Sequence, residues 1–182
     1  MEEDTMGYKR LYKNLIDIIK EEQAKLGFRK EAIRLYYPLS SLNHFFETKD
    51  NEEEMLSKLQ EMPDFIKETL GDIKVTSKKE RFCFHIPEEG SSYVHENTKP
   101  NEFIKELVEI VGKHGCKMED IIALFKEHDK DASVEEINNG EFDHLIRFSE
   151  GNEDTYYYCF KDEGCHIIYH RFLPADYEDF DF

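Results

Sequence analysis

The stretch that decides the fold class is YYYCFKDEGCHIIYHRF, residues Tyr156–Phe172. Two runs rich in aromatic and β-branched residues flank a short polar segment that ends at Gly164, a pattern typical of a β-hairpin. Upstream, apolar and polar residues alternate over residues 142–148, and a polar turn cluster fills residues 149–154. We therefore expect a three-stranded antiparallel meander over residues 141–173.

The pairing expected within this meander defines a candidate binding face. With Asp162-Glu163-Gly164 as a three-residue loop, Phe160 lies opposite His166. If the turn before Tyr156 pairs this residue with Phe148, His144 lies opposite Phe160 on the neighbouring strand. The face then forms an aromatic pocket with histidines at its base, which we call the histidine-floored pocket. Its histidines can titrate, and the pocket can bind a small molecule. The alternative is an ordinary sheet face under helices, with each histidine hydrogen-bonded. The candidate binding residues are His144, His166, His170, Tyr156, Tyr158 and Phe160.

The rest of the chain alternates between helical and extended patterns. Apolar residues at spacings of three and four predict helices, and a period of two predicts strands. We expect a single α+β domain, residues 1–182, in which a mostly antiparallel sheet packs against several helices. The expected order is a helical segment over residues 1–71, a central hairpin 72–87, a loop 88–100, two helices within 100–129, the meander 141–173 and an acidic tail 174–182.

The chain holds 41 acidic against 24 basic residues, a net charge of −17. The charge changes along the sequence, because residues 1–40 carry +1 and residues 141–182 carry −8. Nucleic-acid binding depends on lysine and arginine side chains that neutralise phosphates, so this balance argues against a nucleic-acid partner. No apolar stretch is long enough for a membrane span, so we expect no membrane partner. The acidic surface favours a basic protein partner, and the oligomeric state stays open.

Two segments combine charge with aromatic rings. The acidic tail alternates acids and rings over residues 176–182 and fits a basic, apolar groove with the rings as anchors. Alternatively, the tail is a disordered end or a last strand that packs its own rings. In the second segment, Arg29, Lys30 and Arg34 stand beside two tyrosines, which indicates either a solvated helix face or a receiver for a phosphate or for the tail. The candidate docking residues of the tail are Tyr177, Asp179, Phe180, Asp181 and Phe182.

Motifs for metal binding and catalysis fail at decisive positions. Asp129 and Asp131 begin a segment like a calcium loop, but the required glycine is Val134 and the required glutamate is Gly140. The four cysteines form no CxxC pair, and without an export signal we expect free thiols in a cytoplasmic protein. A cysteine–histidine nucleophile lacks an orienting acid at a recognisable spacing. We expect no catalytic residue, no metal ion and no cofactor, and the pattern favours a protein that is not an enzyme.

The segment Ala32–Leu42, AIRLYYPLSSL, resembles one in a family of small bacterial proteins of unknown function. The resemblance implies a bacterial cytosolic protein and assigns no activity and no residue roles. The leading hypothesis is a non-catalytic, acidic protein-interaction module, one version of which is an immunity-like inhibitor of a basic toxin. The alternatives are a small-molecule-binding protein or hydrolase that uses the histidine and tyrosine face, and a purely structural domain.

Overall fold

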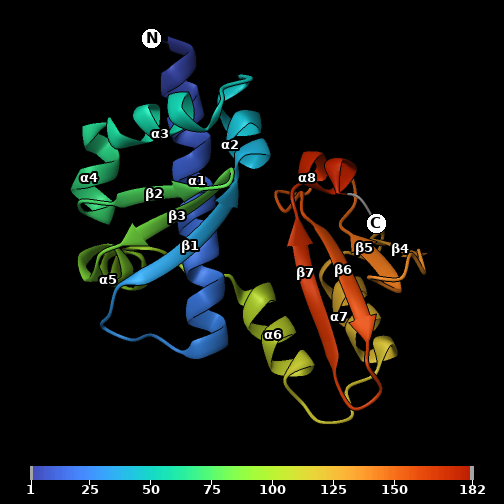
Figure 1. Ribbon diagram of the computed structural model, residues 1–182. Coiled ribbons are helices and arrows are strands. Elements are labelled where there is room, and N and C mark those ends of the chain that lie inside the picture. The colour runs from blue at the N-terminus through green and yellow to red at the C-terminus, as the bar shows by residue number, and fades with distance from the viewer. Residues whose placement is uncertain (1, 181–182) are drawn as a thin grey trace. The chain divides into compact units, whose positions relative to one another are not determined.

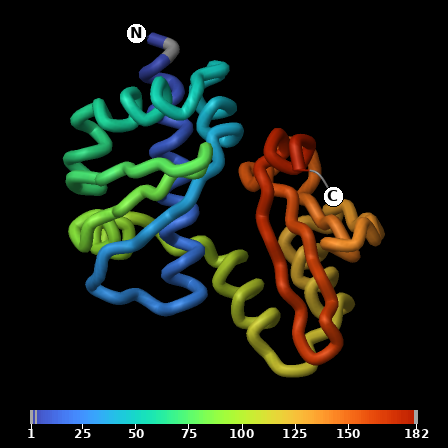
Figure 2. The backbone as a smooth tube through the Cα atoms, viewed as in Figure 1, coloured from blue at the N-terminus to red at the C-terminus, as the bar shows by residue number. Residues whose placement is uncertain are grey.

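The computed structural model describes residues 2–180, and Figures 1 and 2 show its backbone. The chain divides between Asn101 and Glu102 into two compact units, which we name the first unit and the second unit. Each unit contains one antiparallel sheet together with several helices, which confirms the α+β class. The organisation as a single domain stays a prediction.

The first unit is built on a three-stranded antiparallel sheet. Leu35, Phe82 and Phe84 point to one face of this sheet and are buried, and Figure 1 shows the long N-terminal helix running behind the sheet. The buried Tyr37 hydroxyl donates to Asn14 Oδ1 of that helix at 2.6 Å. The elements are α1 (Glu2–Leu26), β1 (Ile33–Pro38), α2 (Leu39–Phe46), α3 (Glu52–Gln60), α4 (Asp64–Leu70), β2 (Lys74–Lys78), β3 (Arg81–Ile86) and α5 (Glu88–Asn97), with the strand order β1-β3-β2.

Strand β2 and strand β3 form the expected central hairpin, but β1 lies within the segment expected to be helical. Leu35 and Tyr37 are buried whereas Arg34 and Tyr36 are exposed, which is the alternation of a half-buried strand. Apolar residues occur on both sides of this alternation, so the sequence does not distinguish a period of two from a helical one. The helical prediction for residues 33–38 was wrong.

The loop expected over residues 88–100 is largely helical. Helix α5 follows Pro87, and its first turn carries Glu88 and Glu89, where negative charge is favourable. Gly90 lets this helix approach α4, because a Cβ atom at Gly90 would lie 2.5 Å from the carbonyl oxygen of Leu70. Gly90, Ser91 and Ser92 therefore belong to a closely packed helix and not to a loop.

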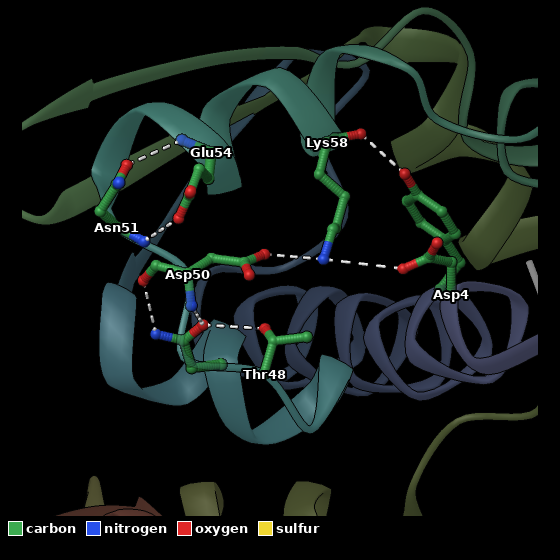
Figure 3. Close-up of polar contacts among 8 residues, drawn as sticks. Asp4, Thr48, Asp50, Asn51, Glu54 and Lys58 are labelled. Atoms are coloured by element: carbon green, nitrogen blue, oxygen red, sulfur yellow. Dashed lines mark hydrogen bonds and ion pairs between the residues drawn. The ribbon is translucent and has the colours of Figure 1, made fainter.

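Side-chain hydrogen bonds fix the connection between α2 and α3 (Figure 3). The Asn43 side-chain oxygen accepts from the Thr48 hydroxyl and from the Asp50 backbone amide, each at 3.0 Å. Lys58 Nζ lies 2.7 Å from Asp50 Oδ2 and 3.6 Å from Asp4 Oδ1. This lysine therefore ties α3 both to the preceding loop and to α1.

The second unit contains the expected meander and one further strand. Figure 2 shows the back-and-forth path of the meander. The further strand precedes it, and all four of its residues are exposed, so it has no burial alternation that a sequence pattern could reveal. The elements are α6 (Glu102–Val111), α7 (Met118–His128), β4 (Ser133–Glu136), β5 (His144–Arg147), β6 (Tyr157–Asp162), β7 (Ile167–Phe172) and α8 (Pro174–Asp179), with the strand order β4-β5-β6-β7.

Aromatic rings hold helices α6 and α7 to one side of this second sheet. Phe103 and Phe125 pack edge-on against Tyr158, with ring centroids 5.7 and 5.1 Å apart. Phe125 also contacts Phe160 edge-on at 6.0 Å. Such edge-to-face pairs add to the free energy of burial, so this side is a hydrophobic core. The opposite side holds a smaller buried cluster of Leu145, Cys159 and Phe172.

Candidate functional site

The pairing of β5 with β6 is as expected, and that of β6 with β7 is not. His144 lies opposite Phe160, which confirms the first register. Across the hairpin, however, Phe160 pairs with Tyr169, so the expected pairing with His166 was wrong by three residues. The turn is longer than expected. Within it, Asp162 Oδ1 accepts from the Gly164 amide at 2.8 Å. A register shift by an odd number of residues moves the side chains of a strand to the other face of the sheet. The three histidines therefore do not lie on a common face.

Each predicted histidine has its own surroundings. His144 is partly buried on the aromatic side, and its Nδ1 atom is buried without a hydrogen-bond partner. His170 is exposed on the opposite side, beside Phe172 at 4.3 Å between ring centroids. His166 lies in the exposed turn, where its Nε2 is 2.9 Å from Glu163 Oε2 and its Nδ1 is 3.1 Å from Cys165 Sγ. The structure therefore does not assemble the histidine-floored pocket.

The predicted aromatic residues of this face are mainly core residues. Tyr158 and Phe160 are completely buried. Burial raises the pKa of Tyr158 well above its usual value, and its hydroxyl donates to Asp154. Tyr156 is partly buried, with the Arg171 guanidinium carbon 4.3 Å from its ring centroid. Binding of a ligand by these residues stays a prediction.

The two rings of the acidic tail that the structure describes, Tyr177 and Phe180, pack on their own sheet. Tyr177, in helix α8, lies 5.2 Å from Tyr157 and 5.9 Å from Phe172 between ring centroids. Phe180 lies 5.2 Å from Phe172 and keeps 43% of its surface exposed. Asp179 is exposed at the end of α8. Two of the candidate docking residues, Asp181 and Phe182, are outside the described residues, and docking of the tail on a partner stays a prediction.

All four cysteines are free, as expected. Burial raises the pKa of the Cys159 thiol to about 12, so this sulfur stays protonated at neutral pH. Cys165 is exposed in the β6–β7 turn, and Cys83 is partly exposed on β3. Among the described residues, no group of three or more histidine, cysteine or acidic side chains is arranged to hold a metal ion. No described helix is long and apolar enough to cross a membrane.

The negative charge is concentrated in the second unit. Residues 102–182 contain 21 acidic and 8 basic residues, a net charge of −13, whereas residues 1–101 contain 20 acidic and 16 basic residues, a net charge of −4. Between residues 131 and 160 the only basic residue among eight acidic ones is Arg147. We define the acidic edge as the exposed glutamates of β4 and of the two loops that flank β5: Glu135, Glu136, Glu141, Glu150 and Glu153.

Three cations of the second sheet make contacts within the unit. Arg147 Nη1 donates to the Tyr157 hydroxyl at 2.9 Å. Lys161 Nζ lies 3.3 Å from Asp143 Oδ1, and Arg171 is only 9% exposed. None of these contacts joins a cation to a carboxylate of the acidic edge, and the structure describes no ion pair for those carboxylates.

The outward face of the first sheet has the opposite charge. Arg34, Lys74, Lys78 and Arg81 are exposed there, and the structure describes no ion pair between them and a carboxylate. His85 is partly exposed between two of these cations. We define the basic face as three rows of residues across β1, β3 and β2, which contain no acid: Arg34–His85–Lys74, Tyr36–Cys83–Thr76 and Pro38–Arg81–Lys78.

One family model matches almost the whole chain. It is described as "Domain of unknown function, E. rectale Gene description (DUF3877)" and covers residues 8–180. The chain belongs to the DUF3877 family. The match confirms the resemblance expected from residues 32–42, namely an uncharacterised bacterial family. No curated protein and no solved structure matches the chain.

In this DUF3877 chain the sequence indicated only a portion of the basic face. The sequence groups Arg34 with Arg29 and Lys30 beside the tyrosines, as either a solvated helix face or a receiver for a phosphate or for the tail. Lys74, Lys78 and Arg81 belong to residues 41–100, whose net charge of −5 conceals them. Alternation within each strand was the available signal, since every second residue of β2 and β3 points away from the core.

Proposed function

We propose that this DUF3877 protein is a non-catalytic interaction protein of the bacterial cytoplasm, which binds a basic protein through the acidic edge of its second unit. The observation that carries the proposal is the net charge of −13 on residues 102–182, together with an acidic edge whose carboxylates make no ion pair that the structure describes. Such a charge raises the local concentration of a cationic partner and speeds its association. Nucleic acid and membrane are not partners in this proposal.

The structure of the edge supports a docking role rather than a general effect of charge. Strand β4 is an edge strand of four exposed residues, and two of them are Glu135 and Glu136. Charged side chains on an edge strand oppose uncontrolled pairing with other strands. Because successive strand residues point to opposite faces, Glu135 and Glu136 place a carboxylate on each side of this sheet edge, where a basic surface can contact them. An inhibitor that blocks a basic toxin is one version of such a protein.

The test is the effect of salt on association with a captured partner. The full chain is immobilised, partners are captured from a bacterial cytosolic extract, and association rates of a purified partner are measured from about 20 to about 200 mM salt. We expect the rate to fall steeply with salt. Glutamine at Glu135, Glu136 and Glu153 should lower the rate at low salt on the order of tenfold.

The matched control places glutamine at three exposed glutamates of the first unit, Glu61, Glu68 and Glu96, and so changes the net charge equally. Its association rate should stay close to that of the wild type. Association that does not depend on salt, equal effects of the two variants, or capture of no basic protein would contradict the proposal.

A further inference from the structure

We propose that the basic face of the first unit binds the acidic edge of a second copy of this chain. The inference rests on the proposed function, because it uses the same acidic edge and names one basic surface that the edge fits. The two surfaces lie on different units, so the contact pairs unlike patches from two molecules. Two such contacts close a pair of molecules when the geometry allows it, and otherwise they form open chains.

The sizes of the two surfaces are compatible. Neighbouring strands lie about 4.8 Å apart and strand residues rise about 3.3 Å each, so the basic face measures about 10 by 13 Å between backbone positions. Strand β4 has four residues and spans about 10 Å between its first and last backbone positions, which matches the shorter dimension of the basic face. In the proposed contact, the four exposed cations of the basic face oppose glutamates on β4 and on the two loops that flank β5.

The basic face also has the composition of an interface centre. The Tyr36 side chain is 53% exposed, and the Arg81 guanidinium carbon lies 5.1 Å from the centroid of its ring. Tyrosine and arginine are enriched at the centres of protein interfaces, where a flat ring supplies contact area at a small entropic cost. Next to this pair, Cys83 and Thr76 provide a small, uncharged centre between the cations.

Charge favours a second copy over a nucleic acid as the occupant. Four cations on a face of about 10 by 13 Å neutralise only a few phosphates, and the rest of the first unit brings its net charge to −4. A polyanion would therefore meet repulsion beyond the basic face. The second unit, with a net charge of −13, is always present at the same concentration as the basic face and carries exposed carboxylates on β4 and on the loops that flank β5.

The experiment compares three full-length variants with the wild type by sedimentation velocity across protein concentration, at about 20 and about 300 mM salt. The face variant carries Arg34→Glu and Arg81→Glu, and the edge variant carries Glu135→Lys and Glu136→Lys. The control carries Lys9→Glu and Lys13→Glu at exposed positions of α1, with the same change in charge as the face variant. Circular dichroism checks that each variant is folded.

We expect the wild type and the control to self-associate at low salt and to dissociate at high salt. The face variant and the edge variant should each associate at least about tenfold more weakly, since each loses its charge pairs. An equimolar mixture of the two variants should form a one-to-one complex, because one retains the acidic edge and the other retains the basic face. This rescue is expected only when the two surfaces meet each other.

A wild type that stays monomeric at low salt overturns the inference, and so does a mixture that does not associate. Poly-L-lysine serves as a cationic probe of the edge alone. If it binds the wild type but not the edge variant while no self-association occurs, this inference is wrong and the proposed function stands. If poly-L-lysine binds neither the wild type nor the edge variant, both this inference and the proposed function are wrong. Tight binding of a single-stranded DNA oligonucleotide through Arg34 and Arg81 would likewise assign the basic face to another occupant.

Discussion

The Arg81 guanidinium carbon lies 5.1 Å from the centroid of the Tyr36 ring, on the outward face of the first sheet. The two side chains come from neighbouring strands, because Arg81 pairs with Pro38, two residues after Tyr36. An exposed cation–π pair contributes about 0.5–1 kcal/mol to stability. This contact therefore matters more for presenting a flat, cationic surface than for holding the fold together.

Replacing Tyr36 with alanine should separate these two roles. We expect Tyr36→Ala to lower the free energy of unfolding by about 1 kcal/mol or less, because the ring is exposed. Self-association measured by sedimentation should weaken on the order of tenfold, because the ring supplies contact area at the centre of the basic face. Tyr36→Phe keeps the ring and is the matched control. If the Tyr36→Ala protein associates as strongly as the wild type, Tyr36 does not contribute to the interface.

The thiols of Cys83 and Cys165 allow the local charge to be measured. Cys83 lies within the basic face, whereas Cys165 lies in a turn beside Asp162 and Glu163. In dilute protein, an anionic aromatic disulfide reagent should modify Cys83 faster at low salt than at high salt, because the cations attract it. The rate at Cys165 should rise with salt. Iodoacetamide is neutral and should show little salt dependence at either site. The same salt trend at both cysteines would contradict the assigned charges.

Gly90 should tolerate no larger residue, although it lies in a helix. Alanine favours a helix over glycine by about 1 kcal/mol, yet its Cβ would lie 2.5 Å from the Leu70 carbonyl oxygen and 2.8 Å from Ile86 Cγ2. We expect Gly90→Ala to lower the free energy of unfolding in urea by about 2 kcal/mol. Glu96→Ala, at an exposed position of the same helix, should change it by about 0.5 kcal/mol or less. A stabilised Gly90→Ala protein would show that α4 and α5 do not pack this closely.

Asp129 should make the stability of the second unit depend on pH in acid. The Ser149 hydroxyl and backbone amide donate to Asp129 Oδ2 at 2.6 and 2.8 Å, and they lower the pKa of this carboxyl. A lowered folded-state pKa gives stability that is complete above the unfolded-state pKa of about 3.9. That stability is lost as the pH falls through the folded-state pKa.

The prediction compares Asp129→Asn with the wild type in urea at several pH values. We expect the variant to be less stable at pH 7 and the difference to shrink as the pH falls below about 4. Asp131→Asn, two residues further along the chain, is the control and should show a small difference at every pH. A difference for Asp129→Asn that stays constant down to about pH 2 would contradict the lowered pKa.

Sequence patterns predicted the elements whose burial alternates cleanly. The pairing of His144 with Phe160 followed from alternation in β5 and β6, and the structure has it. The β6–β7 register did not follow, because Asp162-Glu163-Gly164 admits loops of different lengths and the true turn extends to His166. A shift of three residues was enough to separate the three histidines and to remove the pocket expected from them.

The basic face was beyond the reach of a linear scan of the sequence for a different reason. Its rows join residues that are far apart in the chain, such as Arg34 and His85. Charge summed over long segments averages them with nearby acids, so residues 41–100 appear negative. Only the strand order β1-β3-β2 shows that alternate residues of all three strands point the same way and carry one sign of charge.

The central claim is that a second copy covers the basic face, and protection of Cys83 tests it most directly. The wild type is treated with iodoacetamide over a range of protein concentrations, and modification of Cys83 and Cys165 is quantified separately by peptide mass spectrometry. At low salt, modification of Cys83 should slow as protein concentration rises, and at high salt it should recover, while modification of Cys165 stays constant. A Cys83 rate that does not change with protein concentration at low salt would contradict the claim.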